Sequence, residues 1–323
     1  MPQVIRIERH GGPEVMEWIE LPMPAPGPGE VLLRQTAIGL NFVDVYQRTG
    51  LYPTSLPAVM GSEGAGVVEA LGSGVTAVNV GDRVVYQGAP GAYAETRVVP
   101  AERLIRLPAG IDDRTAAAAF LKGTTVSFLL LRTFKVARGH TVLFHAAAGG
   151  VGQIACQWAK ALGATVIGTV GSNDKMAVAR ANGCDHVINY RTENFAERVK
   201  EITGGAGVEV VYDAVGKDTF YGSLDCLKPL GMFVSFGNAS GVVPEFPIRL
   251  LQQKGSLFAT RPAGQHYLGK RSDLEAAAAS LFAVLVDGSV KIEIGQTFPL
   301  RDAAQAHRAL EDRKTVGATV LLP

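Results

Sequence analysis

Residues 139–163 read Gly139-His140-Thr141-Val142-Leu143-Phe144-His145-Ala146-Ala147-Ala148-Gly149-Gly150-Val151-Gly152-Gln153-Ile154-Ala155-Cys156-Gln157-Trp158-Ala159-Lys160-Ala161-Leu162-Gly163. The apolar run 141–144 is typical of a strand that is buried on both faces. Small residues follow, and apolar side chains then recur at helical spacing until Gly163 ends the helix. The stretch predicts a strand, a glycine turn and a helix, which together present a helix N-terminus to a pyrophosphate.

The turn in this stretch needs small residues, because a Cβ at the contact would hold phosphate oxygens away from the backbone N–H groups. Gly149 and Gly152 occupy the second and third glycine positions of the dinucleotide fingerprint, and Ala147 stands in place of the first. The strand–turn–helix context is what such a motif requires. The residues predicted to contact the pyrophosphate are Ala148, Gly149, Gly150, Val151 and Gly152.

The rest of the chain divides into two patterns, and 323 residues exceed what one hydrophobic core usually holds. Residues 1–120 carry short β-type runs separated by glycine and proline, which is typical of a compact antiparallel barrel. Helices are expected at 115–120 and 124–133. From residue 141 to 260 strands and helices alternate, which predicts a doubly wound parallel sheet of six strands. Beyond it, the pattern predicts a helix at 273–287, a strand pair near 290–298, a helix at 302–312 and a strand at 318–322.

Composition excludes several classes of function. The net charge of +1 offers no field for nucleic acid or an anionic membrane. No segment has 18 or more uninterrupted apolar residues, and the first ten residues lack the apolar core of a signal peptide. The three cysteines are too few and too scattered for a disulfide framework. We therefore expect a cytoplasmic protein with reduced thiols.

The segment 139–160 carries a more specific likeness. Its pattern, Gly139-His140-x-x-Leu143-x-x-x-Ala147-Ala148-Gly149-Gly150-x-Gly152-x-x-x-x-Gln157-x-x-Lys160, resembles the signature of the quinone oxidoreductase/ζ-crystallin branch of the medium-chain dehydrogenases/reductases. Matching segments extend the resemblance over essentially the whole chain. It implies an α/β fold in which a Rossmann doubly wound parallel six-stranded sheet is inserted into a GroES-like β-barrel catalytic domain.

The resemblance also implies limits for the domains and an oligomeric state. Residues 1–121 and 263–323 would form the GroES-like catalytic domain, and residues 122–262 the Rossmann NADPH-binding domain. A homodimer would be joined through the edge strand near 256–260, whose apolar side chains would otherwise lie at an exposed edge.

The end of the second Rossmann strand indicates which dinucleotide binds. NAD-specific sites place a carboxylate there to bind the ribose 2′-hydroxyl, whereas this strand ends Thr169-Val170-Gly171-Ser172. The missing carboxylate favours NADPH over NADH, although Asp174 follows two residues later. The resemblance implies that Lys175, Tyr190 and the hydroxyl of Ser172 contact the 2′-phosphate. Gly171 at the end of the strand is also expected to contact the cofactor. Further cofactor contacts are expected from Phe236, Gly237, Asn238 and Arg313.

The zinc ligands of related alcohol dehydrogenases are missing from this sequence. Zinc-dependent members carry Gly-His-Glu where this chain has Gly61-Ser62-Glu63, and a serine hydroxyl does not replace an imidazole as a zinc ligand. Residues 1–121 contain no cysteine, and the six histidines show no metal-ligand spacing. We therefore expect zinc-independent hydride transfer to an acceptor that is already electrophilic, such as a quinone or an enone.

Residues 39–53 match the family segment that lines the substrate cleft. Tyr46 and Tyr52 are expected to stack on a quinone and to hydrogen-bond its oxygens, which would stabilise the developing negative charge. Asn41 is expected to donate an amide hydrogen bond to cofactor or substrate, and Thr124 resembles a residue that touches the cofactor. The predicted function is NADPH:quinone reduction, with a small-molecule quinone as the substrate.

Two alternatives remain at this point. One is an NADPH-dependent 2-alkenal or enone reductase of the same fold, in which Tyr52 would be the proton donor. The other is a non-enzymatic NADPH-binding protein, either crystallin-like or RNA-binding. The near-neutral charge argues against RNA, and the tyrosine cluster argues against a purely structural role. The choice between one- and two-electron transfer stays open.

Overall fold

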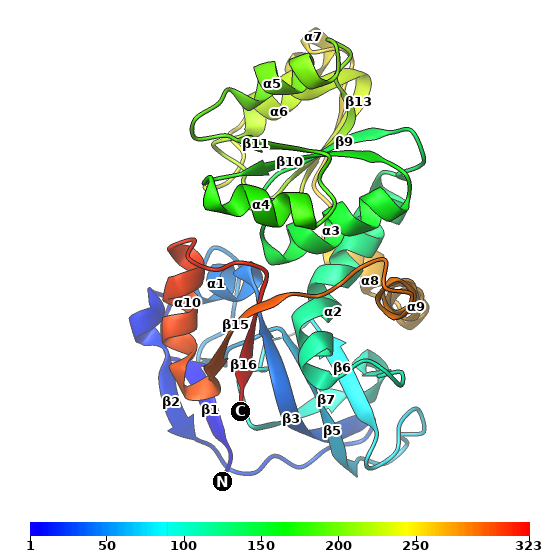
Figure 1. Ribbon diagram of the computed structural model, residues 1–323. Coiled ribbons are helices and arrows are strands. Elements are labelled where there is room, and N and C mark those ends of the chain that lie inside the picture. Colours follow the sequence, from blue (N-terminus) through cyan, green and yellow to red (C-terminus); the bar gives the residue numbers. More distant parts are fainter. Residues whose placement is uncertain (89) are drawn as a thin grey trace. The chain divides into compact units, whose positions relative to one another are not determined.

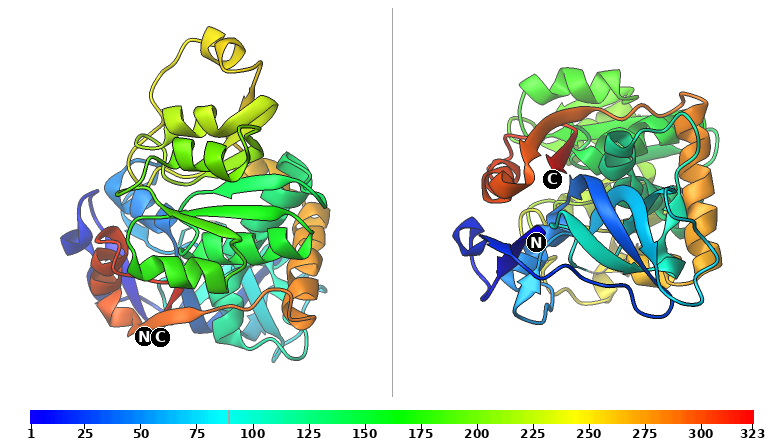
Figure 2. Two further views of the ribbon diagram at one scale, coloured as in Figure 1. Left: turned by 45° about the horizontal axis from the view of Figure 1, so that its top comes forward. Right: turned by 90° about the horizontal axis from the view of Figure 1, so that it is seen from below.

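The computed structural model describes residues 1–88 and 90–323, which form two compact units. The first unit comprises Met1–Lys122 and Ile292–Pro323, so it contains both termini, and the second comprises Gly123–Lys291 (Figure 2). Residues 263–291, which the sequence places in the catalytic domain, therefore lie in the second unit. They are held there by an ion pair of 3.1 Å between Arg132 and Asp273 and by the stacked rings of Phe128 and Tyr267.

The second unit is built on a parallel six-stranded sheet, as the alternating pattern predicts (Figure 1). Its strand order is β11-β10-β9-β12-β13-β14, so the order reverses between β9 and β12, where Rossmann ligands bind. The interior of the sheet is apolar because both faces are covered. The strands are β9 (Thr141–Phe144), β10 (Thr165–Val170), β11 (His186–Asn189), β12 (Val208–Asp213), β13 (Leu227–Ser235) and β14 (Phe258–Thr260).

Helices cover both faces of this sheet (Figures 1 and 2). Helices α3 (Gly150–Ala161) and α4 (Asp174–Ala181) lie on one face, and α5 (Phe195–Ile202) and α6 (Phe220–Cys226) lie side by side on the other. The later helices of the unit are α7 (Arg249–Gln253), α8 (Gly264–Leu268) and α9 (Arg271–Val286).

The first unit contains a seven-stranded sheet and a three-stranded sheet. The large sheet has the order β15-β16-β3-β5-β6-β8, and β7 also pairs with β3. Its strands are β3 (Glu30–Leu40), β5 (Glu63–Leu71), β6 (Arg83–Gln87), β7 (Thr96–Pro100), β8 (Ile105–Arg106), β15 (Ile294–Pro299) and β16 (Ala318–Leu322). The small sheet has the order β2-β1-β4, with β1 (Gln3–Ile7), β2 (Glu17–Glu20) and β4 (Ala58–Val59).

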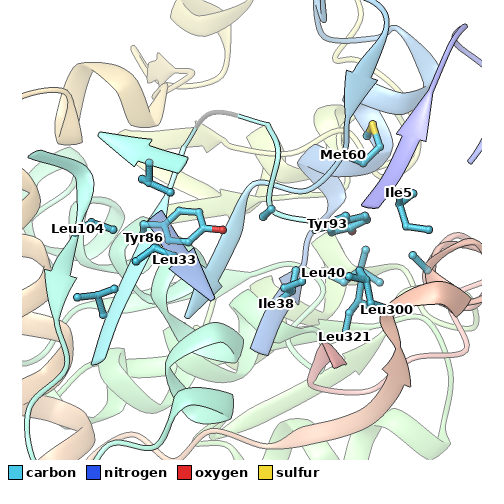
Figure 3. Close-up of a cluster of buried hydrophobic side chains, with 14 of the residues drawn as sticks. Ile5, Leu33, Ile38, Leu40, Met60, Tyr86, Tyr93, Leu104, Leu300 and Leu321 are labelled. Atoms are coloured by element: carbon cyan, nitrogen blue, oxygen red, sulfur yellow. The ribbon is translucent and has the colours of Figure 1, made fainter. Parts of the chain in front are cut away.

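The last 30 or so residues complete the first unit, because β16 pairs antiparallel with β3. Figure 3 shows that its core joins side chains from the two ends of the chain, among them Ile5, Leu40, Leu300 and Leu321. Helices α1 (Phe42–Thr49) and α10 (Ala303–Glu311) belong to this unit, as do the short 3-10 turns Pro13–Val15, Ala101–Arg103 and Leu300–Asp302.

Two predicted elements differ from those observed. The helices expected at 115–120 and 124–133 form one helix, α2 (Asp113–Phe128), which ends in a π-type turn at Leu129–Thr133. Gly123 lies inside this helix, where a Cβ would approach the Leu281 side chain to 2.3 Å, so the missing side chain makes room for packing. The strand pair expected near 290–298 is a single strand, β15, because its partner is the distant β16.

Candidate active site

The glycine turn between β9 and α3 has the geometry of a pyrophosphate site. The N–H of Gly149 donates to the Ala146 carbonyl at 2.9 Å, and α3 begins at the next residue. A Cβ on Gly152 would lie 2.3 Å from the Ala146 carbonyl oxygen, so only glycine allows this close packing. The first N–H groups of a helix have no acceptor within it, and here they belong to Gly150 and Val151. The turn therefore fits a dinucleotide phosphate.

The residues predicted to bind the 2′-phosphate follow two neighbouring parallel strands. Gly171 and Ser172 follow β10 and Tyr190 follows β11, so they share the carboxyl edge of the sheet. A Cβ on Gly171 would lie 3.0 Å from the Tyr190 hydroxyl. Lys175 lies half-buried in the first turn of α4. A hydrogen bond from Ser172 is the main cause that lowers the pKa of Asp174, so this carboxylate competes for the Ser172 hydroxyl.

Phe236, Gly237 and Asn238 follow β13 at the same edge of the sheet. The N–H of Phe236 donates to the Asp213 carbonyl at 2.8 Å, and a Cβ on Gly237 would lie 2.5 Å from the Ala214 carbonyl oxygen. Arg261 donates to the Gly237 carbonyl at 3.3 Å. Thr124 is buried within α2, and Arg313 is exposed just after α10, in the first unit. Their cofactor contacts stay predictions.

Asn41 is the residue that caps the N-terminus of α1. Its backbone N–H donates to Asp44 Oδ2 at 2.9 Å. The side-chain Nδ2 donates to Glu63 Oε2 at 2.9 Å and to the Gly39 carbonyl at 3.3 Å. The donor role expected for Asn41 toward a ligand therefore requires one of these bonds to be exchanged, and it stays a prediction.

Glu63 and Lys122 form a buried ion pair that sequence reasoning missed. Glu63 is fully buried, and its Oε2 lies 3.4 Å from the Lys122 ammonium. Glu63 also accepts the backbone N–H of Leu121. A Cβ on Gly39 would lie 2.3 Å from Glu63 Oε2, so this glycine makes space for the carboxylate. The detectable signal was a carboxylate at the first position of a glycine-rich buried strand.

Tyr46 and Tyr52 come together, as the residue pattern suggests. Their ring centroids are 5.1 Å apart, and the N–H of Tyr52 donates to the Tyr46 carbonyl at 3.0 Å. The chain after Tyr52 lines a pocket of about 350 Å³, whose walls are 53–55, 58–59 and 90–91. This volume is at the small end of the range for ligand sites.

A buried hydrogen-bonded chain lies behind α1. The Tyr93 hydroxyl donates to Asp44 Oδ2 at 3.1 Å and lies 3.0 Å from His307 Nε2. The guanidinium of Arg48 lies 3.3 Å from His307 Nδ1 and is paired with Glu311 at 2.7 Å. Since Arg48 donates to Nδ1, the remaining hydrogen of a neutral His307 is on Nε2 and points at Tyr93. The chain thus links α1 to α10.

Burial sets the charge states in this chain. Loss of solvation raises the pKa of the Asp44 carboxyl to about 6, although the neighbouring Ser62, Asn41 and Tyr93 oppose the shift. Asp44 Oδ1 is buried without a hydrogen-bond partner, which is consistent with a carboxyl group that is readily protonated. Burial and the neighbouring Arg48 lower the pKa of His307 to about 3. His307 is therefore neutral at physiological pH.

Ser62, which stands where zinc-dependent members of the class carry a histidine, is buried. Its hydroxyl donates to Gln47 Oε1 at 3.3 Å. Within residues 1–88 and 90–323, no group of three or more histidine, cysteine, aspartate or glutamate side chains is arranged to hold a metal ion.

None of the helices in the described part of the chain is long and apolar enough to cross a membrane.

Comparisons with known proteins agree with these features. A family model described as zinc-binding dehydrogenase matches residues 150–281, and one described as alcohol dehydrogenase GroES-like domain matches residues 27–109. The chain is 52% identical to a quinone oxidoreductase of Pseudomonas aeruginosa over 100% of both chains. It is 49% identical to a 2-haloacrylate reductase of a Burkholderia species over 98% of both. The crystal structure of Escherichia coli quinone oxidoreductase complexed with NADPH has a TM-score of 0.97 and 49% identity, covering 99% of this chain and 100% of that one.

The dinucleotide-type sheet inserted into a GroES-like unit defines the class of medium-chain dehydrogenases/reductases. Within this class, the chain is about 50% identical over its full length to quinone oxidoreductases. The chain belongs to the quinone oxidoreductase family.

Proposed function

We propose that this protein is an NADPH-dependent quinone oxidoreductase that works without zinc. The observation that carries the proposal is the tyrosine pair Tyr46–Tyr52, which lies beside a pocket in a chain whose other unit carries a nucleotide-binding turn. The quinone oxidoreductases of Pseudomonas aeruginosa and Escherichia coli support the substrate class, and the NADPH complex of the latter supports the cofactor.

The second unit would bind NADPH through three groups of residues at the carboxyl edge of its sheet. The helix N-terminus at Gly150–Gly152 would take the pyrophosphate. Ser172, Lys175 and Tyr190 would take the 2′-phosphate, with the lysine balancing its charge. Phe236–Asn238 would hold the nicotinamide half. Bound NADPH supplies the hydride.

The first unit would supply the contacts to the substrate. The rings of Tyr46 and Tyr52 offer an apolar surface on which a quinone can stack. Their hydroxyls would donate hydrogen bonds to the quinone oxygens, on which negative charge develops during reduction. The buried Glu63–Lys122 pair holds Asn41 at the beginning of α1. The residues thus act by orientation and electrostatics.

The zinc-independent chemistry rests on the donor set. Ser62 offers a hydroxyl where zinc enzymes of this class carry a histidine, and residues 1–121 have no cysteine. A quinone is electrophilic without a Lewis acid, and the anion formed by its reduction can take a proton from water.

A homodimer and a cytoplasmic location complete the proposal. Strand β14 forms an edge of the six-stranded sheet, and Phe258 on it is 57% exposed. Joining two copies along β14 would satisfy its unpaired backbone groups and cover this ring.

A second candidate is reduction of an activated alkene, which the 49% identical 2-haloacrylate reductase favours. Such a reaction adds hydride to one alkene carbon and a proton to the other. Tyr52 would be the proton donor. The two reactions share the cofactor and differ in their need for a positioned acid.

The test is anaerobic oxidation of NADPH with p-benzoquinone, measured beside a 2-alkenal and beside NADH as a control cofactor. We expect fast turnover with the quinone and NADPH. Faster turnover of the 2-alkenal would favour the second candidate. Tight NADPH binding with no turnover of either acceptor would contradict the assignment as an enzyme.

A further inference from the structure

A second buried polar network lies beneath the carboxyl edge of the nucleotide-binding sheet. The Thr169 hydroxyl on β10 lies 2.8 Å from His145 Nδ1, and His145 Nε2 lies 2.9 Å from Ser223 Oγ on α6. Ser223 Oγ donates in turn to Asp213 Oδ2 at 3.2 Å, at the end of β12. Since the serine hydrogen goes to Asp213, His145 is the donor through Nε2 and accepts from Thr169 through Nδ1. All four side chains are buried.

Asp213 is the residue on which the bonds of this network converge. Its Oδ1 accepts the backbone N–H groups of Val215 and Gly216 at 2.7 and 3.0 Å. Its Oδ2 accepts the Thr219 hydroxyl at 2.7 Å in addition to that of Ser223. The carboxylate therefore fixes the loop 214–219 from within.

The loop 214–219 in turn fixes the segment that follows β13. Ala239 donates its N–H to the Ala214 carbonyl at 3.1 Å, and Ser240 donates to the Val215 carbonyl at 2.8 Å. Space is short between the two loops, because a Cβ on Gly216 would lie 2.3 Å from the Gly241 carbonyl oxygen. A displacement of loop 214–219 must therefore displace the neighbouring residues 236–241.

We propose that Asp213, with Thr219, Ser223 and His145, positions residues 236–238 for the nicotinamide half of NADPH. The inference rests on the proposed function. The adenosine half depends on Gly171, Ser172 and Lys175, which lie after β10 and outside the loops that Asp213 holds. The Asp213 end of the network therefore acts on the nicotinamide half of the cofactor.

The experiment compares two ligands that share the adenosine half. Dissociation constants for NADPH and for 2′,5′-ADP are measured by calorimetry on the full chain. The variants are Thr219→Val and Ser223→Ala, which each remove one hydroxyl without changing charge. Either variant should weaken NADPH binding about tenfold, the typical loss for one hydrogen bond to a charged group. Binding of 2′,5′-ADP should change less than about twofold, because the adenosine half does not depend on these loops.

Two further variants separate positioning from general damage to the fold. Thr203→Val removes a half-buried hydroxyl that bonds to Val199 and Gly207 near the start of β12, at the other edge of the sheet. It should leave the affinity of both ligands unchanged. Thr219→Ser keeps the hydroxyl and should restore NADPH affinity.

The possible outcomes distinguish this inference from the proposed function. Equal weakening of both ligands in the Thr219 and Ser223 variants, or no weakening of either, would overturn the positioning role. Failure of the unmodified protein to bind NADPH would overturn the proposed function and the inference together. A protein that binds both ligands and loses only NADPH in these variants bears out both.

Discussion

The two units each bury one histidine in a hydrogen-bonded chain, but the charges beside these histidines are opposite. His145 lies between two hydroxyls in a chain that ends on the Asp213 carboxylate. His307 lies between the Tyr93 hydroxyl and the Arg48 guanidinium. Burial lowers the pKa of both imidazoles, yet Asp213 opposes this at His145, whereas Arg48 adds to it at His307.

The difference indicates that the two hydrogen-bonded chains have different roles, one in stability and one in cofactor binding. The chain through His307 joins α1 to α10, which lie far apart in sequence, and it contains a fully buried cation. We interpret it as a support that keeps the first unit together. The chain through His145 ends under loops at the ligand-binding edge of a sheet, so disturbance there should appear in cofactor affinity.

The largest effect is expected from Arg48→Ala. The change leaves His307 and the Gly11 carbonyl without a donor and Glu311 without its partner. Each buried acceptor left without a donor, here His307 Nδ1 and the Gly11 carbonyl, typically costs about 1–3 kcal/mol of unfolding free energy. Denaturant unfolding measures it. Arg34→Ala is the matched control, because its ion pair with Glu69 is exposed and should be worth less than about 1 kcal/mol. Equal losses in the two variants would contradict the support role.

The next effect is on the pH dependence of stability. An unfolded histidine binds a proton near pH 6.5, whereas folded His307 stays neutral down to about pH 3. Its contribution is therefore complete above about pH 6.5 and is lost as the pH falls, at about 1.4 kcal/mol per pH unit. His307→Gln should remove this slope between about pH 6 and pH 4.

Variants of Asp44 and His145 should also change the pH dependence of the unfolding free energy. Because burial raises the pKa of Asp44 to about 6, the folded state holds its proton more tightly, and stability falls as the pH rises toward that value. The unfolding free energy of Asp44→Asn should therefore fall more steeply with decreasing pH than that of the unmodified protein. His145→Gln should flatten the slope less than His307→Gln does, because Asp213 offsets part of the burial at His145. A larger flattening in His145→Gln would reverse the comparison.

A smaller effect distinguishes the hydrogen-bonded chain through His307 from the one through His145. The first should affect stability, and the second should affect NADPH affinity. Tyr93→Phe deletes a buried hydroxyl next to Asp44 and His307, which should cost about 1–2 kcal/mol of unfolding free energy. NADPH affinity should stay within about twofold, in contrast to Ser223→Ala, because the Tyr93 hydroxyl supports α1 and not the nucleotide-binding edge. Calorimetric titration of both variants provides the comparison. Loss of NADPH affinity in Tyr93→Phe would mean that the two chains are not independent.

Much of the second unit could be predicted from local pattern. The apolar run 141–144, the small residues after it and the helical spacing beyond specify a strand, a turn and a helix without any distant contact. The missing carboxylate after β10, where Ser172 stands, can likewise be recognised from the local sequence alone. The pattern did not predict that residues 263–291 belong to this unit. Their place depends on contacts between distant segments, such as that between Arg132 and Asp273.

The polar interior was harder to predict, because its members come from distant segments. His307 lies 214 residues from Tyr93, and Glu63 lies 59 residues from Lys122. In the sequence, Glu63 stood out only as the neighbour of the missing zinc ligand, and Asp213 carried no predicted role. Carboxylates that follow or begin buried strands are the signal that could have identified both.

The central claim is that the second unit binds NADPH and that the reducing equivalents reach a quinone. The most direct measurement is an anaerobic single turnover, in which NADPH absorbance is followed after equimolar protein–NADPH complex is mixed with p-benzoquinone. The account predicts loss of the full NADPH absorbance and formation of one hydroquinone per NADPH, with a slower reaction in Tyr46→Phe and Tyr52→Phe. Unchanged absorbance from a complex that binds NADPH tightly would contradict it.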